Sequence, residues 1–287
     1  MFVGNRGPIY GAGSFTQPIT IIKELGQGGF ATTYLVETDD GEQLAMKAID
    51  TENLAKKGLS TNTVINEINT LISLSSEPNC YPYIACYHGY SRFKLHGKDV
   101  IAIFSDYVQG PTLTEYIDEL LDKNPGPEYD KLKNHMIHLL EALVRVHDAG
   151  YAHRDIKPEN IIYDTKNNRL VLIDFGVACM GRCLGIAGTH IWMPLELLYN
   201  PPESLNAAQS HDIWSLGIVF YELANLEFPF DITSIDKKED TARALRGPLT
   251  PSHYPDNKIN YVIDRMLSKN WRDRPTASSL LNYIKSW

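Results

Sequence analysis

A turn dense in glycine near the N-terminus has the composition of a loop that could bind phosphate. It consists of Leu25, Gly26, Gln27, Gly28, Gly29, Phe30 and Ala31, and β-branched runs flank it. Where side chains are missing, backbone N–H groups can approach a polyphosphate closely. A strand pattern rather than a helix follows and no GxxxxGK[ST] pattern occurs, which disfavours a Rossmann dinucleotide site and a P-loop. A plain hairpin turn that uses glycine for a positive φ is the alternative.

A lysine and a glutamate farther along the chain could orient phosphate groups. Lys47 lies in the apolar run 43–49, and Glu67 lies in the segment 61–74, whose apolar residues recur at helical spacing. A lysine inside an apolar strand needs a counter-charge, and a helix glutamate beside it could turn the ammonium toward α- and β-phosphates. A strand lysine that reaches solvent is the alternative.

The richest group of reactive side chains is His153-Arg154-Asp155-Ile156-Lys157-Pro158-Glu159-Asn160, followed by Asp174-Phe175-Gly176. Together with the glycine turn and Lys47, in this order, these segments resemble the eukaryotic protein kinase family. The resemblance covers residues 19–287. The lysine two residues after Asp155 is similar to that of the serine/threonine subgroup.

The resemblance implies a role for each matching residue. Asp155 accepts or orients the proton of the attacking hydroxyl, Lys157 steadies the γ-phosphoryl group, and Asn160 and Asp174 bind Mg²⁺, with Mn²⁺ as an alternative ion. Oxygen ligands of this kind suit a hard cation. The implied cofactor is ATP, and its contacts are the turn residues Leu25, Gly26, Gln27, Gly28, Gly29, Phe30 and Ala31 with Thr33, Ala45, Lys47, Glu67, Asp106, Val108 and Ile162.

The implied fold is the α+β, bilobal protein-kinase fold. A glycine-rich flexible leader is expected over residues 1–18, an N-lobe of small antiparallel sheet with one main helix over 19–108, and a hinge with a larger, mainly helical C-lobe over 109–287. In the C-lobe, the apolar periodicity from Leu132 to Val146 predicts a helix that ends near Gly150. Short strands are expected around 161–163 and 170–173.

Residues after the second motif resemble the segment that receives the substrate. The family's Ala-Pro-Glu appears as Pro194-Leu195-Glu196, and Arg274 matches the arginine that pairs with the glutamate. Asp212 and Gly217 match a central scaffold helix. Three departures from the family pattern are Ala31 for glycine, Thr33 for valine and Leu195 for proline, and the first two are expected to weaken nucleotide binding without abolishing it.

The predicted function is transfer of the ATP γ-phosphate to serine or threonine of protein substrates. A pseudokinase scaffold is disfavoured because Lys47, Asp155 and Asp174 are all present, and a small-molecule kinase is disfavoured by Lys157 and the Gly188-Thr189 loop. Because residues 177–187 contain no hydroxyl side chain, the enzyme is predicted to be active without activation-loop phosphorylation. Glu159 and Glu222 match acidic positions that receive arginine in basophilic relatives, so basic substrates are favoured.

Composition sets limits on the remaining classes. The 287 residues are 43% hydrophobic and 22% charged, with a net charge of −8, which disfavours a nucleic-acid partner. No signal peptide is expected, and the apolar stretch Ile213–Leu226 is too short to insert in a membrane. We expect a cytoplasmic monomer with reduced thiols at Cys80, Cys86, Cys179 and Cys183. Cys179 and Cys183 are interpreted as unreactive thiols of a loop, with a redox switch as the alternative. His135 and His138 are interpreted as helix-surface residues rather than a metal pair.

Overall fold

A computed structural model describes residues 14–75, 80–123, 127–181, 183, 185–233, 235 and 237–287. The chain divides into two compact units, one up to Val108 and one from Gln109 to Trp287. Most of the leader predicted over residues 1–18 lies outside the described residues. Its last part is tied to the first unit, because the Phe15 N–H donates to the Tyr90 carbonyl and the Phe15 ring stacks on Phe104 at 4.0 Å.

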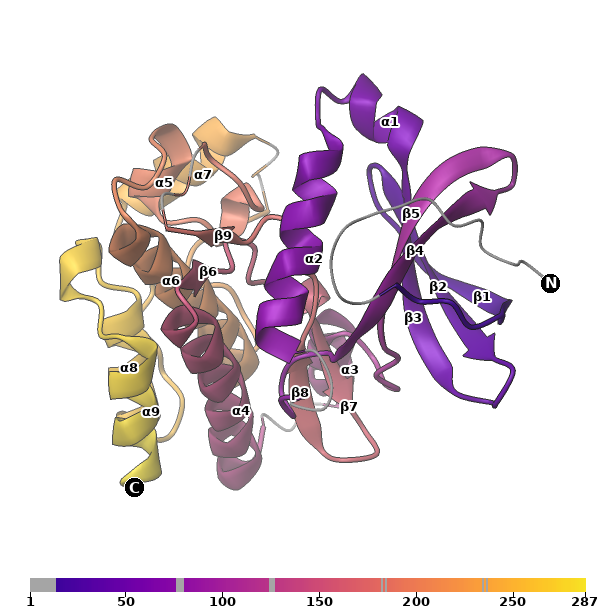
Figure 1. The fold of residues 1–287 in the computed structure, drawn as a ribbon. Coiled ribbons are helices and arrows are strands. Elements are labelled where there is room, and N and C mark those ends of the chain that lie inside the picture. The colour runs from indigo at the N-terminus through magenta and orange to yellow at the C-terminus, as the bar shows by residue number, and fades with distance from the viewer. Residues whose placement is uncertain are drawn as a thin grey trace. The chain divides into compact units, whose positions relative to one another are not determined.

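The first unit is built on one antiparallel sheet whose strands follow the order β1-β2-β3-β5-β4 (Figure 1). Its strands are β1 (Ile19–Gln27), β2 (Ala31–Thr38), β3 (Gln43–Asp50), β4 (Tyr87–Leu95) and β5 (Lys98–Asp106). Side chains alternate between the two faces of a strand. In β3, Leu44, Met46 and Ala48 point into a core that also contains Val36 and Phe104. Ala45 and Lys47 therefore lie on the opposite face of the sheet.

Two helices complete the first unit. The short helix α1 (Thr51–Lys56) begins where the Asp50 carboxylate accepts the Asn53 N–H at 2.9 Å, an N-terminal cap. The longer helix α2 (Thr61–Ser75) packs beside β4 and buries Val64, Ile68 and Leu71 (Figure 1). The main helix was predicted from its apolar periodicity, whereas α1 was not, because six residues with one buried leucine carry no periodic signal.

The second unit is mainly helical, with two small two-stranded sheets. Its α-helices are α3 (Leu113–Lys123), α4 (Tyr129–Asp148), α5 (Leu195–Tyr199), α6 (Leu205–Asn225), α7 (Lys238–Arg246), α8 (Asn257–Met266) and α9 (Ala277–Lys285). Its strands are β6 (Tyr151–Ala152), β7 (Ile161–Asp164), β8 (Arg169–Leu172) and β9 (Cys179–Met180). Three 3₁₀ turns, η1 (Pro158–Asn160), η2 (His190–Trp192) and η3 (Trp271–Asp273), lie in its loops.

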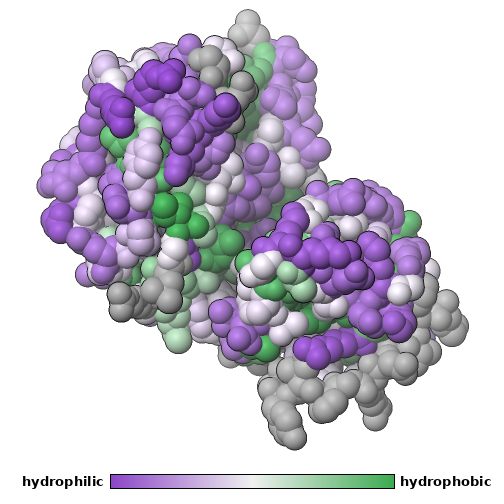
Figure 2. All heavy atoms as spheres, turned by 90° about the horizontal axis from the view of Figure 1, so that it is seen from above, coloured by the Kyte–Doolittle hydropathy of each residue, from purple (hydrophilic) through white to green (hydrophobic). Residues whose placement is uncertain are grey.

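Helix α6 forms the centre of the second unit and is buried along most of its length. Gly217 lets α8 approach closely, because a Cβ at this position would lie 2.9 Å from the Met266 Cβ. Helices α4 and α9 pack side by side (Figure 1). Within the described ranges, no helix combines the length and apolar character that crossing a bilayer requires. Hydrophilic residues dominate the face seen in Figure 2, with hydrophobic ones in narrow patches.

The interpretation of His135 as a helix-surface residue is wrong. Its side chain is buried in α4, in edge contact with the rings of Tyr116 and Tyr163. Burial lowers the pKa of His135 to about 3, so the imidazole is neutral. A single histidine within an apolar periodicity can be either surface or core, and only the packing of α3 and β7 on α4 decides between them.

Candidate active site

The glycine turn joins β1 to β2 without using glycine for backbone conformation. Gly26, Gly28 and Gly29 do not have positive φ, and the Gly28 N–H donates to the Ala31 carbonyl at 2.8 Å. A Cβ at Gly26 would meet no atom within 4 Å, and one at Gly28 would make ordinary contact with Ala31 at 3.4 Å. Neither glycine is required by the fold of the turn. This observation disfavours the plain-hairpin alternative and favours close approach of a ligand to the backbone.

Lys47 and Glu67 form an ion pair in the first unit. The Lys47 Nζ lies 2.6 Å from the Glu67 Oε1, and the two side chains are 21% and 6% exposed. β3 places Lys47 opposite Thr33 of β2, and α2 carries the glutamate on its buried face. Because the ammonium has this buried counter-charge, it does not extend to solvent as an isolated strand lysine would.

The predicted adenine contacts of the first unit lie on the same strands. Thr33, Ala45 and Lys47 share one face of the sheet, by the register of β2 and β3. Asp106 ends β5, where its N–H donates to the Cys86 carbonyl at 2.9 Å. Val108 is the last residue of this unit. The backbone from Asp106 to Val108 is thus anchored at its start by Cys86, the residue before β4.

In the second unit, Asp155 lies in a loop that Asp212 of α6 anchors. The Asp212 carboxylate accepts the N–H groups of His153 and Arg154, both at 2.8 Å, and lies 2.9 Å from the His147 Nε2. Arg154 has a φ of 72°, which is unfavourable for a residue with a side chain. The buried carboxylate therefore holds a strained backbone beside Asp155.

The pKa of Asp212 follows from these contacts. Burial alone raises the pKa, but the hydrogen bond and charge of His147, the charge of His153 and the Arg154 N–H outweigh burial and lower it. The side chain therefore stays ionised as an anchor. Asp212 was predicted as a scaffold residue, whereas His147 was not predicted, because nothing in its sequence surroundings points to a residue in α6.

The Asp155 carboxylate is surrounded by donors from three residues, Lys157 and Asn160 of its own loop and Thr189 of a later segment. Its Oδ1 accepts the N–H and the hydroxyl of Thr189, both at 2.9 Å. Its Oδ2 lies 3.1 Å from the Lys157 Nζ and accepts the Asn160 Nδ2 at 3.1 Å. Lys157 also donates to the Thr189 hydroxyl at 2.8 Å. These bonds fix the orientation of a carboxylate that is only 17% exposed.

Asn160 and Asp174 offer oxygen atoms in and next to the loop that carries Asp155. The Asn160 Nδ2 also donates to the Asp155 carbonyl at 2.8 Å, which leaves the amide oxygen as the ligand atom. The Ile173 N–H donates to the Asn160 carbonyl at 2.9 Å, so the two segments are joined directly. Asp174 is exposed, has a φ of 60° and precedes the buried Phe175. Its Oδ1 accepts the Gly176 N–H at 3.0 Å, so the carboxylate is held in this conformation from its own loop.

Ile162 lies on β7, opposite Val171 of β8, and forms an isolated bridge to Thr112. Its neighbours Ile161 and Asp164 are buried, while Ile162 itself is half-buried. The structure thus places this predicted adenine contact next to the segment that follows Gln109, within the second unit.

The segment after Asp174 is held at both ends. β9 pairs Cys179 with Ala152 of β6 near its start. At its end, the Arg274 Nη1 lies 2.7 Å from the Glu196 Oε1, which confirms the predicted ion pair. The Arg274 side chain is fully buried, and its other donors bind the carbonyls of Ser210, Ser268 and Lys269.

The expectation of reduced thiols is not met in this structure. Disulfides join Cys80 to Cys86 and Cys179 to Cys183, with Cα–Cα distances of 5.3 Å and 5.5 Å. Both pairs span short turns. Cys183 is buried against Ala152 and Ala208, which the sequence did not indicate because the contacts come from β6 and α6, distant along the chain.

Comparison with known proteins identifies related chains. Residues 19–284 match the family model described as "Protein kinase domain". A probable serine/threonine-protein kinase nek2 of Dictyostelium discoideum is 27% identical over 92% of this chain and 61% of its own length. An Arabidopsis thaliana MAP3K epsilon protein kinase 1 is 30% identical over 91% of this chain and 18% of its own length. A Danio rerio serine/threonine-protein kinase pim-2 is 28% identical over 94% of this chain and 84% of its own length.

Proposed function

Because this chain belongs to the protein kinase domain family, we propose that it transfers the γ-phosphate of ATP to serine or threonine hydroxyls of protein substrates. The chain spans less than two thirds of the Dictyostelium and Arabidopsis relatives, so the proposal concerns the activity of this domain. In the reaction, the substrate oxygen forms a bond to the γ-phosphorus, the bond to the β,γ-bridging oxygen breaks, and ADP leaves.

The arrangement around Asp155 is the observation that carries this proposal. Phosphoryl transfer asks the protein chiefly for positioning and for neutralisation of charge on the phosphate oxygens. Asp155, held by Thr189, Lys157 and Asn160, can accept the proton of the acceptor hydroxyl. Lys157 places a positive charge within 3.1 Å of that carboxylate, where it can meet the transferred group. Thr189, which donates to Asp155, would lie beside an acceptor side chain that approaches this carboxylate.

The nucleotide and its cation are assigned to the remaining residues. Lys47, oriented by Glu67, would bind the α- and β-phosphates. The backbone of the turn from Gly26 to Gly29 would cover them, apart from the Gly28 N–H, which donates to the Ala31 carbonyl. The Asn160 amide oxygen and the Asp174 carboxylate fit a hard divalent cation, Mg²⁺ or alternatively Mn²⁺. When bound, the cation neutralises charge on the phosphate oxygens.

Two acidic side chains support a modest preference for basic substrates. Burial, followed by the negative charge of Glu159 in η1, raises the pKa of Glu222 on α6, so the two carboxylates repel each other. An arginine of the substrate near both carboxylates would relieve this repulsion. The cytoplasmic location, the monomeric state and the absence of a nucleic-acid partner stay predictions.

Replacement of one carboxylate tests the proposed chemistry. The wild-type protein, Asp155→Asn and the control Asp148→Asn would each receive Mg·ATP with labelled γ-phosphate and a mixture of serine/threonine peptides, tyrosine peptides and small alcohols. Asp148 is an exposed aspartate at the end of α4. We expect the wild type and the control to label serine and threonine peptides. The rate of Asp155→Asn should be lower by a factor of about 100 or more. Nucleotide affinity should be retained.

Label in the small alcohols alone would identify a small-molecule kinase. Nucleotide binding without transfer by the wild type would identify a scaffold. Undiminished transfer by Asp155→Asn would contradict the role of the carboxylate.

A further inference from the structure

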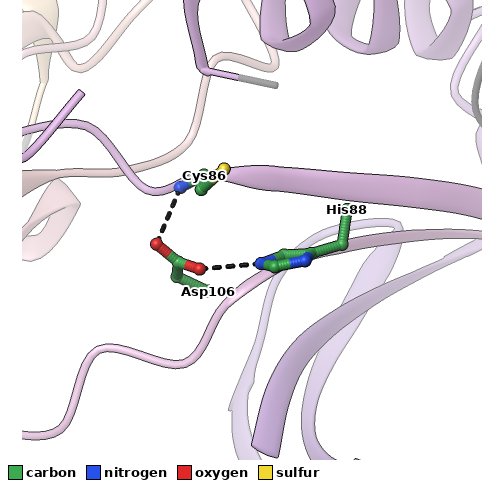
Figure 3. Close-up of side chains that lie close together, drawn as sticks. All are labelled: Cys86, His88 and Asp106. Atoms are coloured by element: carbon green, nitrogen blue, oxygen red, sulfur yellow. Dashed lines mark hydrogen bonds and ion pairs between the residues drawn. The ribbon is translucent and has the colours of Figure 1, made fainter. Parts of the chain in front are cut away.

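Three potential metal ligands meet where β5 ends and β4 begins. A ring nitrogen of His88, the Sγ of Cys86 and a carboxylate oxygen of Asp106 all lie within 4.8 Å of one another (Figure 3). All three belong to the first unit. Cys86 is buried, the His88 side chain is 10% exposed and the Asp106 side chain is 43% exposed, so the group opens to solvent on one side.

Backbone structure holds this cluster in place. The Asp106 N–H donates to the Cys86 carbonyl, and the Cys86 N–H donates to the Asp106 Oδ2 at 3.1 Å (Figure 3). The pairing of β4 with β5 shifts between Tyr87 and Gly89, which leaves His88 at a bulge. A bulge redirects a side chain relative to the regular alternation. Here the imidazole points at Asp106, with the His88 Nε2 2.7 Å from the Asp106 Oδ1.

A fourth ligand is supplied by Cys80. It is exposed and bonded to Cys86 in this structure, with a Cα–Cα distance of 5.3 Å, so its sulfur is adjacent to that of Cys86. A dithiol reductant would convert this disulfide into two thiols and become a disulfide itself. The Cys80 thiol would then stand next to the Cys86 sulfur, which belongs to the cluster with His88 and Asp106.

We propose that Cys80, Cys86, His88 and Asp106 form a zinc-binding site when the two cysteines are reduced. The cation would replace the thiol protons and bind two thiolates, one imidazole nitrogen and one carboxylate oxygen. Four ligands of these types suit tetrahedral Zn²⁺, whereas Mg²⁺ and Ca²⁺ prefer oxygen ligands alone. The disulfide and the zinc complex are mutually exclusive, because a disulfide sulfur carries no thiolate charge.

The required rearrangement is small. Zinc bonds of about 2.0–2.3 Å in a tetrahedron place neighbouring ligand atoms roughly 3.3–3.8 Å apart. The His88 Nε2 and the Asp106 Oδ1, now 2.7 Å apart, would separate by roughly 0.6 Å. The other ligand atoms of the cluster lie within 4.8 Å of one another, so they would approach by about 1.5 Å at most. The cation would take the place of the hydrogen bond between His88 and Asp106. The site uses none of the residues assigned to the catalytic cation, Asn160 and Asp174, and does not depend on the proposed kinase activity.

Metal content measures the proposal directly. The test uses the full chain with Cys179→Ala and Cys183→Ala, which removes the other two thiols. After reduction with a phosphine and removal of the reductant without oxygen, the protein receives Zn²⁺, is desalted, and its zinc is measured. We expect about one zinc ion per chain. Co²⁺ in place of zinc should give a thiolate-to-cobalt charge-transfer band and the intense visible bands of tetrahedral cobalt.

Single ligand variants identify the site. Each of three variants removes one ligand atom: Cys80→Ser, Cys86→Ser and His88→Ala. Loss of a residue that only supports the ligands of a metal site costs roughly 10- to 100-fold in metal affinity, and we expect each of these variants to weaken zinc binding by more than that. The matched controls are His253→Ala and Asp99→Asn, because both residues are exposed and Asp99 lies on β5 like Asp106. These controls should bind zinc as the parent does. Oxidation to the disulfide should release the cation.

Three results would overturn the proposal. They are reduced protein without bound zinc, cobalt spectra without a thiolate band, and full zinc affinity in His88→Ala. Because His88→Ala leaves both cysteines and the disulfide intact, it remains informative even if a cysteine variant fails to fold, which circular dichroism would detect.

Discussion

Thr189 donates two hydrogen bonds to a single oxygen of Asp155, one from its N–H and one from its hydroxyl, both 2.9 Å long. The same hydroxyl accepts a hydrogen bond from Lys157 at 2.8 Å. The segment that follows Asp174 is therefore bound to the proposed catalytic loop by a threonine side chain, without a phosphate group. The structure thereby supports the interpretation of Thr189 as a positioning residue.

Removal of this hydroxyl should impair catalysis. Thr189→Val keeps the shape of the side chain but loses the hydrogen bond that the hydroxyl donates to Asp155 and the one that it accepts from Lys157. We expect kcat to fall about 10- to 100-fold. Thr189→Ser restores the hydroxyl and should remain within a few-fold of wild type. Steady-state kinetics with a peptide substrate provides the measurement. Equal rates for Thr189→Val and Thr189→Ser would show that the hydroxyl does not position Asp155.

The enzyme should be active without phosphorylation between residues 174 and 196. Thr189 is the sole hydroxyl side chain in that part of the sequence, and it is already engaged with Asp155. Arg154, directly before Asp155, donates to the Gly185 carbonyl of this segment. Phosphatase treatment, followed by removal of the phosphatase, should leave the initial rate unchanged. Mass spectrometry measures the phosphate on this segment before and after treatment. A large loss of rate that accompanies loss of this phosphate would contradict the prediction.

Lys47→Met should lower kcat by about 100-fold or more, because the ammonium that Glu67 orients at 2.6 Å would no longer position the phosphates. The matched control is Lys56→Met, since Lys56 is an exposed lysine of α1 that forms its own ion pair with Glu52. Turnover at saturating ATP distinguishes the two variants. A change of only a few-fold in Lys47→Met would assign this lysine a structural role.

The ion pair between Arg274 and Glu196 should matter for stability. Arg274→Ala leaves Glu196 and three carbonyls without their donor, and we expect a loss of about 3–5 kcal/mol in the free energy of unfolding. Arg272→Ala, which removes an exposed pair with Glu203, should cost less than about 1 kcal/mol. All four tryptophans lie in the second unit, so their fluorescence in urea follows its unfolding. Similar losses in both variants would show that burial of the pair is unimportant.

The preference for arginine should depend on pH. Burial, with the charges of Glu159 and Asp118, raises the pKa of Glu222 to about 7. The carboxyl is therefore mainly neutral at pH 6 and mainly ionised at pH 8, so its attraction for arginine grows as the pH rises. The ratio of kcat/KM for an arginine peptide to that for its glutamine counterpart should increase up to about tenfold over this range.

The variant Glu222→Gln should abolish this increase, and Glu239→Gln, which alters an exposed glutamate on α7, should retain it. If the ratio of the two kcat/KM values stays constant in the wild type between pH 6 and pH 8, Glu222 does not take part in recognition of the substrate arginine.

Local patterns predicted elements whose signals are contained in short stretches of chain. The apolar periodicity of α4 and the strand character of β7 and β8 were predicted near their observed positions. The pairing of Glu196 with Arg274 was also predicted, through the family resemblance. Helix α1 was missed because its stability comes from the Asp50 cap and from packing on β3 and β5.

Residue identity and order determined which groups are available for chemistry, because a carboxylate, an ammonium or a glycine has its properties wherever it lies in the fold. Their mutual arrangement was decided by tertiary structure. The anchoring of Arg154 by Asp212, the burial of His135 and the cluster of Cys86, His88 and Asp106 all join residues that are distant in the chain or displaced by a bulge. Distances between such residues depend on packing and strand register, which no local pattern encodes.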